Sequence, residues 1–347
     1  MIWLSWRQFR VQTIVAGAAL VVVAIAFAGT GPHLVSLFDN SGLATCRASC
    51  SADAHAFIDE VSGSTIQLIF YGSIFLLYAV PALIGIFWGA PLVARELETG
   101  TFRVAWNQSV TRTRWIAVKL GLIGLATVAT TGLLSLMTFW WASPLYEVAQ
   151  KAGQNGLSIR KVAPPLFGGI GIVPVGCAAF AFALGVAAGV LVRRTIPAMA
   201  VTLVIFAAVQ AVMPLLVQPH LIPPVQATAP FNANTADEVV VTQAGSGPLT
   251  MILKGDFSRP GAWILENQTI TQSGQVFTGP ATSACLSISA PPQACNNSLN
   301  RLHLRQLVTY QPASRFWPLQ WMETGIYFVL AAGLGALCTW RIRQRRA

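Results

Sequence analysis

The sequence predicts an all-α polytopic membrane protein with six transmembrane helices, an N-terminal interfacial helix and a small, partly β extracytoplasmic domain. Of its 347 residues, 54% are hydrophobic and only 10% are charged, whereas about a quarter of the residues in soluble domains are charged. Apolar runs of the length needed to cross a bilayer recur six times. Basic residues flank these runs, so the net charge of +10 indicates membrane orientation rather than nucleic-acid binding.

The first segment, residues 1–11, is expected to be an interfacial amphipathic helix. Its aromatic and basic residues are Trp3, Trp6, Arg7, Phe9 and Arg10. Tryptophan and arginine side chains suit the boundary between membrane and water. The alternative is a secretory signal peptide, because Ala26-Phe27-Ala28 resembles a cleavage site. Two tryptophans near the start and five further apolar runs favour the interfacial helix.

The six spans are expected at residues 12–30, 66–90, 115–141, 167–192, 196–217 and 322–340. An even number of spans places both termini on one side of the membrane. With that side cytoplasmic, 13 basic residues lie inside, and only Arg47, Lys151, Arg160 and Lys161 lie in the short outer loops. Cytoplasmic loops carry the excess of Lys and Arg. Residues 12–217 therefore hold spans one to five with a cytoplasmic loop at 91–114, and residues 322–347 hold the sixth span and a basic tail.

The fourth and fifth spans are separated only by Arg193-Arg194-Thr195, which predicts a tight cytoplasmic hairpin. Glycines such as Gly168, Gly169, Gly185 and Gly189 permit close helix approach. Pro174 is expected to kink the fourth span.

Residues 218–321 are expected to form the extracytoplasmic domain. Runs typical of strands lie at 238–242, 249–253 and 275–278, with Gly and Pro between them. Cys46, Cys50, Cys285 and Cys295 all fall in segments assigned to the outside. An oxidising compartment permits disulfides within each loop or between the loops. Zinc is the alternative, but neither Cys-x3-Cys nor Cys-x9-Cys has the usual ligand spacing. Cys177 and Cys338 lie in spans and are interpreted as small apolar fillers.

Motifs for catalysis or nucleotide binding are absent from the sequence. There is no Gly-x4-Gly-Lys-Ser/Thr loop, no His-Glu-x2-His and no nucleophile elbow. We therefore expect a non-catalytic chain without a metal site. The spans are nearly free of charge, which disfavours a proton-coupled transporter or a channel with a charged filter. Lys119 is expected to reach the cytoplasmic interface by snorkelling. Glu323 lies at the outer mouth of the sixth span, where ordinary interfacial solvation is the alternative to a functional role.

The loop between the second and third spans carries the only cytoplasmic carboxylates, Glu96 and Glu98. They form a short acidic helix segment that Gly100 is expected to end in a left-handed cap. Arg95-Glu-Leu-Glu-Thr-Gly-Thr101 resembles the motif between spans two and three of type-2 ABC exporter permeases. Residues 1–8, 106–115 and 310–317 also resemble a bacterial subgroup of that family, as do the six spans and the large last outer loop.

The resemblance implies a coupling helix that docks on a separate ABC ATP-binding subunit. Carried over by position, the coupling residues are Arg95, Glu96, Glu98, Gly100 and Thr101, with Arg193 and Arg194 as a second contact. The alternatives are a solvated, helix-capping acidic turn and a positive-inside anchor. The resemblance also implies a permease homodimer in the bilayer of the bacterial inner membrane, with both termini cytoplasmic. This chain would hold no cofactor, and ATP and Mg²⁺ would bind the partner subunit.

The near absence of charge in the spans predicts an apolar or amphipathic substrate, and the family exports drugs, lipids, polysaccharides and peptides. The candidate path residues are Phe70, Tyr71, Phe75, Tyr78 and Glu323. Packing or lipid contact is the alternative for each aromatic residue. A competing function is a membrane-anchored sensor or adaptor whose outer domain binds a ligand and whose cytoplasmic loop recruits a partner. An intramembrane enzyme lacks any supporting residue constellation.

Overall fold

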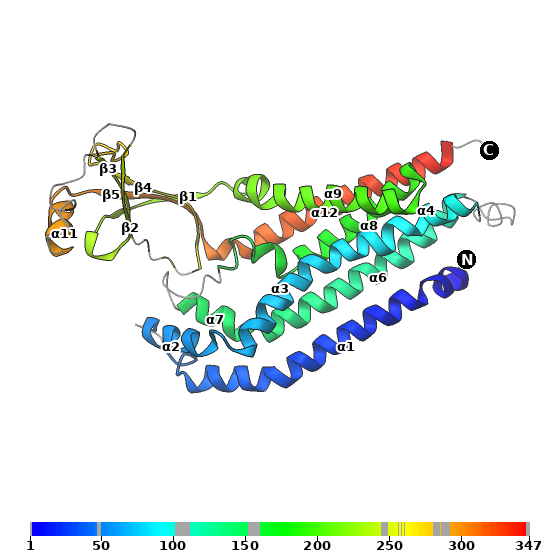
Figure 1. Cartoon of the computed structure of the whole chain (residues 1–347), viewed down its shortest axis with the longest axis horizontal. Helices are drawn as coiled ribbons and strands as arrows, with labels where there is room; N and C mark the ends of the chain where they lie inside the picture. The colour runs from blue at the N-terminus through cyan, green and yellow to red at the C-terminus, as the bar shows by residue number, and fades with distance from the viewer. Residues whose placement is uncertain are drawn as a thin grey trace.

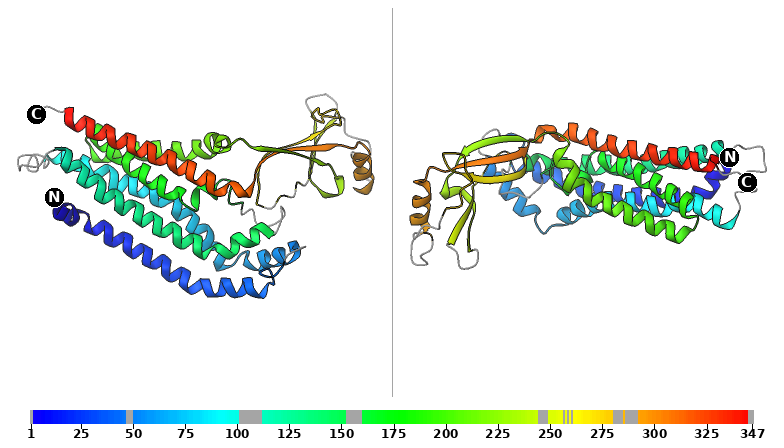
Figure 2. Two further views of the ribbon diagram at one scale, coloured as in Figure 1. Left: turned by 180° about the vertical axis from the view of Figure 1, so that it is seen from behind. Right: turned by 90° about the horizontal axis from the view of Figure 1, so that it is seen from above.

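The computed structural model describes residues 2–46, 50–100, 112–151, 160–243, 249–279 without 256, 258 and 260, residue 285, and residues 292–344. An elongated helix bundle carries a β-rich region at one end, and both chain termini lie at the opposite end (Figure 1). Two further views show the same separation (Figure 2). Within the described chain, six helices are long and apolar enough to cross a membrane. The predicted helical fold with six candidate spans is therefore confirmed, and the N-terminal interfacial helix stays a prediction.

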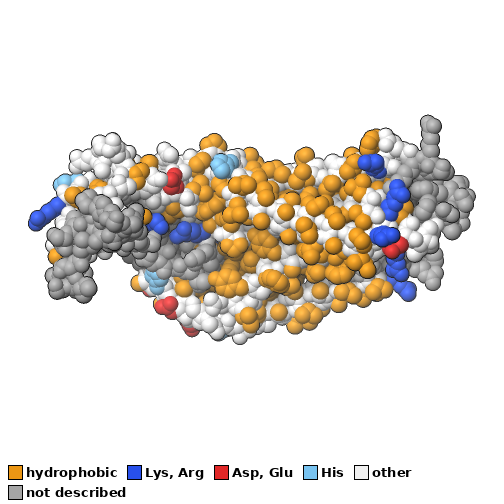
Figure 3. All heavy atoms as spheres, turned by 45° about the horizontal axis from the view of Figure 1, so that its top comes forward, with side chains coloured by type: hydrophobic (Ala, Val, Ile, Leu, Met, Phe, Trp, Pro, Cys, Tyr) orange, Lys and Arg blue, Asp and Glu red, His pale blue; other side chains and the backbone are white. Residues whose placement is uncertain are grey.

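The long helices are α1 (Ile2–Asn40), α3 (Thr65–Ile84), α6 (Arg112–Trp141), α8 (Val173–Val192), α9 (Thr195–Val212) and α12 (Phe316–Gln344). The shorter ones are α2 (Ser51–Val61), α4 (Ala90–Thr99), α7 (Ser143–Lys151) and α11 (Pro292–Asn300). A π-helical turn, η1 (Gly85–Gly89), joins α3 to α4 without a break, so residues 65–99 form one helix. Apolar side chains cover the middle of the bundle, and charged side chains gather towards its two ends (Figure 3).

The helices differ from the expected spans in their bounds. The helix of the fourth span begins at Val173 rather than near 167, and Pro174 lies in its first turn. A proline there removes no helical hydrogen bond, so it starts α8 and does not kink it. The first helix runs on to Asn40 instead of ending near 30, and no break separates residues 2–11 from the span.

Helix α8 is the core of the bundle, because 78% of the residues in its most apolar stretch are buried. It packs against α3, α4, α6, α9 and α12. Glycines permit the closest of these contacts, because a Cβ on Gly189 would lie 2.6 Å from Ala90 O and one on Gly89 would lie 2.6 Å from Phe182 O. The predicted role of fourth-span glycines in close helix approach is confirmed for Gly185 and Gly189.

The region between α9 and α12 contains two antiparallel sheets. One has the order β1 (Val225–Pro230), β5 (Arg305–Gln311), β4 (Trp263–Ile270), and the other pairs β2 (Ala236–Gln243) with β3 (Leu249–Gly255). The predicted strands at 238–242 and 249–253 are confirmed by β2 and β3. The third prediction is wrong, because residues 275–278 contribute only an isolated bridge from Val276 to Ile270. Strand β5 lies between β1 and β4, which the chain order does not reveal.

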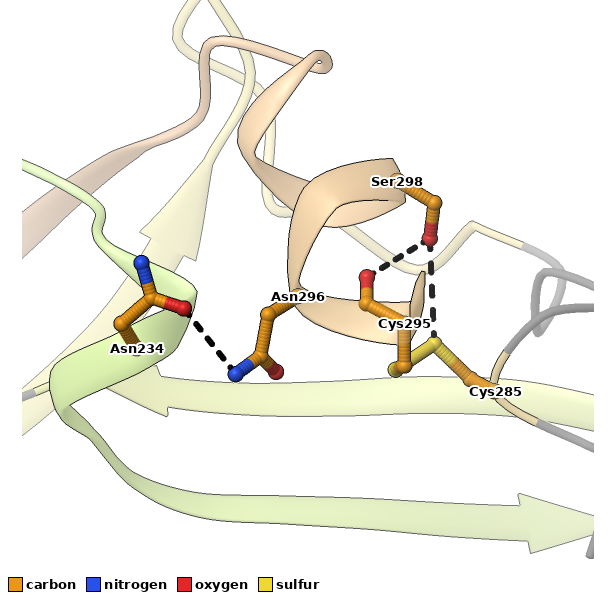
Figure 4. Close-up of a disulfide and its surroundings, with 5 residues drawn as sticks. All are labelled: Asn234, Cys285, Cys295, Asn296 and Ser298. Carbon is orange, nitrogen blue, oxygen red and sulfur yellow. Dashed lines mark hydrogen bonds between the residues drawn. A yellow bond between two sulfur atoms is a disulfide. The ribbon is translucent and has the colours of Figure 1, made fainter. Parts of the chain in front are cut away.

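Both disulfides close within their own segments, Cys46 with Cys50 and Cys285 with Cys295. The second bond tethers α11, and Asn296 Nδ2 of the same helix donates to Asn234 Oδ1 at 3.1 Å (Figure 4). Of the two alternatives left by the sequence, pairing within each loop is the observed one. Cys177 and Cys338 are buried free thiols, and Cys177 is more than an apolar filler because its Sγ donates to Gln210 Oε1 at 3.6 Å.

Candidate functional site

The acidic helix α4 lies at the end of the bundle that holds both termini (Figure 1). It ends at Thr99, and Gly100 adopts the predicted left-handed conformation with φ +74°. The helix from Thr65 to Thr99 has 35 residues, or about 52 Å at 1.5 Å per residue. The hydrocarbon core of a bilayer is only about 30 Å thick. The continuous helix is therefore longer than the apolar layer is thick.

Glu98 connects α4 to the hairpin between α8 and α9. Its Oε2 accepts hydrogen bonds from the Thr195 backbone N–H at 3.1 Å and from Thr195 Oγ1 at 2.8 Å. Thr195 is the first residue of α9, and Arg194 before it provides no side-chain cap. Glu98 thus caps α9 from another helix and places its negative charge at the positive end of that helix. The Thr195 hydroxyl, then its N–H, and the Arg194 charge lower the pKa of Glu98.

Glu96 faces a different helix. Its Oε1 forms an ion pair with Lys119 Nζ on α6, and the two side chains are 17% and 5% exposed. The sequence predicts that Lys119 snorkels towards the cytoplasmic interface, and in the structure its ammonium group pairs with Glu96 of α4. The two carboxylates of α4 therefore hold α4 to α9 and to α6.

The remaining predicted coupling residues are placed around these two contacts. Arg95 is exposed on α4, Arg193 ends α8 in a left-handed conformation with φ 63°, and Arg194 precedes α9. Thr101 lies outside the described residues. The structure thus brings α4 and the α8–α9 hairpin, which the sequence treats as two separate contacts, into one hydrogen-bonded surface.

The substrate-path candidates do not form one group. Phe70 is buried with its ring centroid 6.1 Å from that of Tyr146. Tyr71 and Phe75 are 50% and 70% exposed on the outer surface of α3. Only Tyr78 and Glu323 line the same cavity, an enclosed space of about 20 Å³ between α3, α8, α9 and α12. Such a volume holds about one water molecule.

Glu323 is only 4% exposed, so interfacial solvation is wrong as an account of it. Its Oε2 has no hydrogen-bond partner within the described chain. Nearby, Gln210 Oε1 accepts a hydrogen bond from Tyr327 Oη at 3.0 Å and lies 3.6 Å from Cys177 Sγ. The carboxyl therefore belongs to a polar cluster inside the apolar bundle.

Several polar residues that the sequence analysis missed hold the segment before α8, residues 160–172. Gln320 of α12 accepts from the N–H groups of Ile172 and Val173 at 2.9 and 3.0 Å, and its Nε2 donates to Phe167 O at 3.0 Å. Tyr78 donates to Pro165 O, and Ser135 donates to Gly171 O. Irregular backbone at membrane depth requires such internal partners. Gln320, two residues before the sixth apolar run, was the sequence signal for these contacts.

A family model described as ABC-2 membrane transporter related matches residues 17–218. The match covers more than half of the chain and contains α4, α8 and the hairpin that follows α8. Comparison with curated proteins and with solved structures gives no match.

Proposed function

Because the chain belongs to the family of ABC-2 related membrane transporters, we propose that it is the permease subunit of an ATP-driven exporter. It moves an apolar or amphipathic substrate, such as a drug, a lipid or a peptide, out of the cell. A separate ATP-binding subunit supplies the energy, with ATP and Mg²⁺ bound there. The termini face the cytoplasm of a bacterial inner membrane, and two copies of the chain form the transporter.

The observation that carries this proposal is the hydrogen-bonded surface of α4 and the α8–α9 hairpin. Glu98 joins the two elements through Thr195, so a partner that pushes on one of them moves both. Helix α4 is continuous with α3 through η1, and Ala90 and Ala94 of α4 lie directly against Gly189 of α8. Since α8 is the buried core helix, a displacement of α4 reaches the centre of the bundle.

The segment at residues 160–172 is the proposed outer gate of this exporter. It closes the bundle near the β-rich end through Gln320, Tyr78 and Ser135. Movement of α3 or α12 breaks these bonds, because Tyr78 and Gln320 lie on those helices. The polar cavity at Glu323 and Tyr78 adjoins the gate, and an amphipathic substrate would present its polar part there.

The test is to co-purify the chain with a P-loop ATPase encoded in an adjacent reading frame and to measure stimulated ATP hydrolysis in liposomes. Glu98→Ala should reduce stimulation at least about tenfold, because it removes both hydrogen bonds that join α4 to the α8–α9 hairpin. Glu60→Ala, an exposed carboxylate on α2, is the matched control. Unchanged stimulation in Glu98→Ala, or transport by the chain without any ATPase, would contradict the proposal.

A further inference from the structure

A long groove separates α1 from α3, α4 and α6 and is distinct from the proposed gate, and two of the predicted coupling residues, Arg95 and Glu96, line it. It consists of two adjoining cavities of about 670 and 520 Å³. Both cavities are lined by Gln12, Phe87, Trp88 and Arg95, so they form one continuous space. Each volume falls within the about 300–1,000 Å³ of ordinary ligand sites.

The larger cavity is apolar and opens on the surface that faces lipid. Its α1 wall runs from Val11 to Val23, about 18 Å of helix at 1.5 Å per residue. Half of the hydrocarbon core is about 15 Å thick. Only 6% of the residues in the most apolar stretch of α1 are buried, so this helix packs weakly and leaves the groove open. The dimensions and lining suit one acyl chain of a single leaflet.

The smaller cavity gives the groove a cationic end. Glu96 and Lys119 line it and neutralise each other as an ion pair, which leaves the charge of Arg95. Within the described chain, no carboxylate forms an ion pair with Arg95. Gln12 also lines this end, and its Oε1 is buried without a partner among the described atoms. An anionic group that also carries a hydroxyl would satisfy both side chains, because the anion pairs with the Arg95 guanidinium and the hydroxyl donates to Gln12 Oε1.

We propose that this groove binds an anionic membrane phospholipid, with one acyl chain along α1 and the phosphate at Arg95. The charge complementarity and the apolar continuation of the site support a lipid, since a guanidinium recognises phosphate with paired donors. A second copy of this chain would fill the apolar part with side chains but would provide no anion to pair with Arg95. Because Arg95 lies on α4 and the acyl chain on α1, the lipid bridges two helices that otherwise pack sparingly.

The test uses the full chain in detergent, without nucleotide or ATPase, and counts bound lipids by native mass spectrometry. The probes are phosphatidylglycerol and phosphatidylcholine with identical acyl chains. We expect one phosphatidylglycerol per chain to bind about tenfold more tightly than phosphatidylcholine, because the choline ammonium offsets the phosphate charge that attracts Arg95 and provides no hydroxyl to donate to Gln12 Oε1. Arg95→Gln should remove this preference, whereas Arg341→Gln, an exposed arginine on α12 at the same end of the bundle, should leave it unchanged.

A second pair of variants tests the acyl-chain part of the groove. Ala19→Trp fills it, whereas Ala18→Trp places the same ring on an exposed face of α1 outside it. We expect Ala19→Trp to lower phosphatidylglycerol binding at least about tenfold relative to Ala18→Trp, because the filled groove excludes the chain. Equal binding of the two lipids by the natural protein, or equal binding by the two tryptophan variants, would overturn the proposal. So would a change of oligomeric state in Ala19→Trp with lipid retention unchanged.

Discussion

Lys119 and Glu96 form an ion pair that is almost withdrawn from solvent, with side-chain exposures of 5% and 17%. Removing one member of a buried pair leaves an uncompensated charge and costs about 3–5 kcal/mol, whereas replacing both with apolar residues is often close to neutral. Lys119→Met should therefore lower the thermal unfolding temperature in detergent strongly. Lys119→Met combined with Glu96→Leu should recover most of the loss. A double variant no more stable than the single one would show that the pair is not the cause.

Glu98 supports a prediction about pH. Its hydrogen bonds from Thr195 lower its pKa in the folded protein below the ordinary value of 4.5. A carboxyl with a depressed folded pKa stabilises the protein above its unfolded pKa and loses that contribution as the pH falls through the folded value. The natural protein should exceed Glu98→Gln in unfolding temperature at pH 7, and the difference should disappear as the pH falls below 4.5. A constant difference from pH 7 to pH 3 would argue against the cap.

At the scale of elements, the contact between α4 and α8 depends on glycine. A Cβ on Gly189 would lie 2.6 Å from Ala90 O, a backbone atom that cannot rotate away. Gly189→Ala should force the helices apart and cost about 1–3 kcal/mol, as overpacking does. Gly121→Ala on α6 is the matched control, because nothing lies within 4 Å of its added Cβ. Thermal unfolding of both variants in the same detergent measures the difference, and equal stability would contradict the close contact.

The helices of the bundle are predictable because each apolar run is long, and Gly100 marks the end of α4 with a local signal that needs no tertiary information. The partners of the polar residues cannot be predicted in this way. Nothing local in the sequence indicates that Glu96 meets Lys119, or that Gln320 caps the segment before α8, since the partners lie 23 and about 150 positions away. Burial of Glu323 was missed for the same reason, because helix packing decides its exposure rather than distance from the end of the span.

At the scale of the whole molecule, both termini lie at one end of the bundle and the sheets lie at the other (Figure 1). The proposed function requires the first end to face the cytoplasm, and the excess of arginine and lysine there favours that orientation. Gln272 is exposed in the β-rich region, and Gln344 is exposed at the end of α12. Single cysteines at these positions can report the side of the membrane, because Cys177 and Cys338 are buried and the other four cysteines are paired.

The expected outcome is that a membrane-impermeant maleimide labels Gln272→Cys in intact cells and labels Gln344→Cys only after permeabilisation. The physical reason is that α4 and the α8–α9 hairpin must reach an ATPase, and ATP is held in the cytoplasm. The natural protein is the labelling background, since its free thiols are buried. The reverse labelling would place Glu98 and Thr195 outside, where no ATP-binding subunit could move α4. The hydrogen bonds between α4 and α9 would then hold the bundle together without transmitting any force.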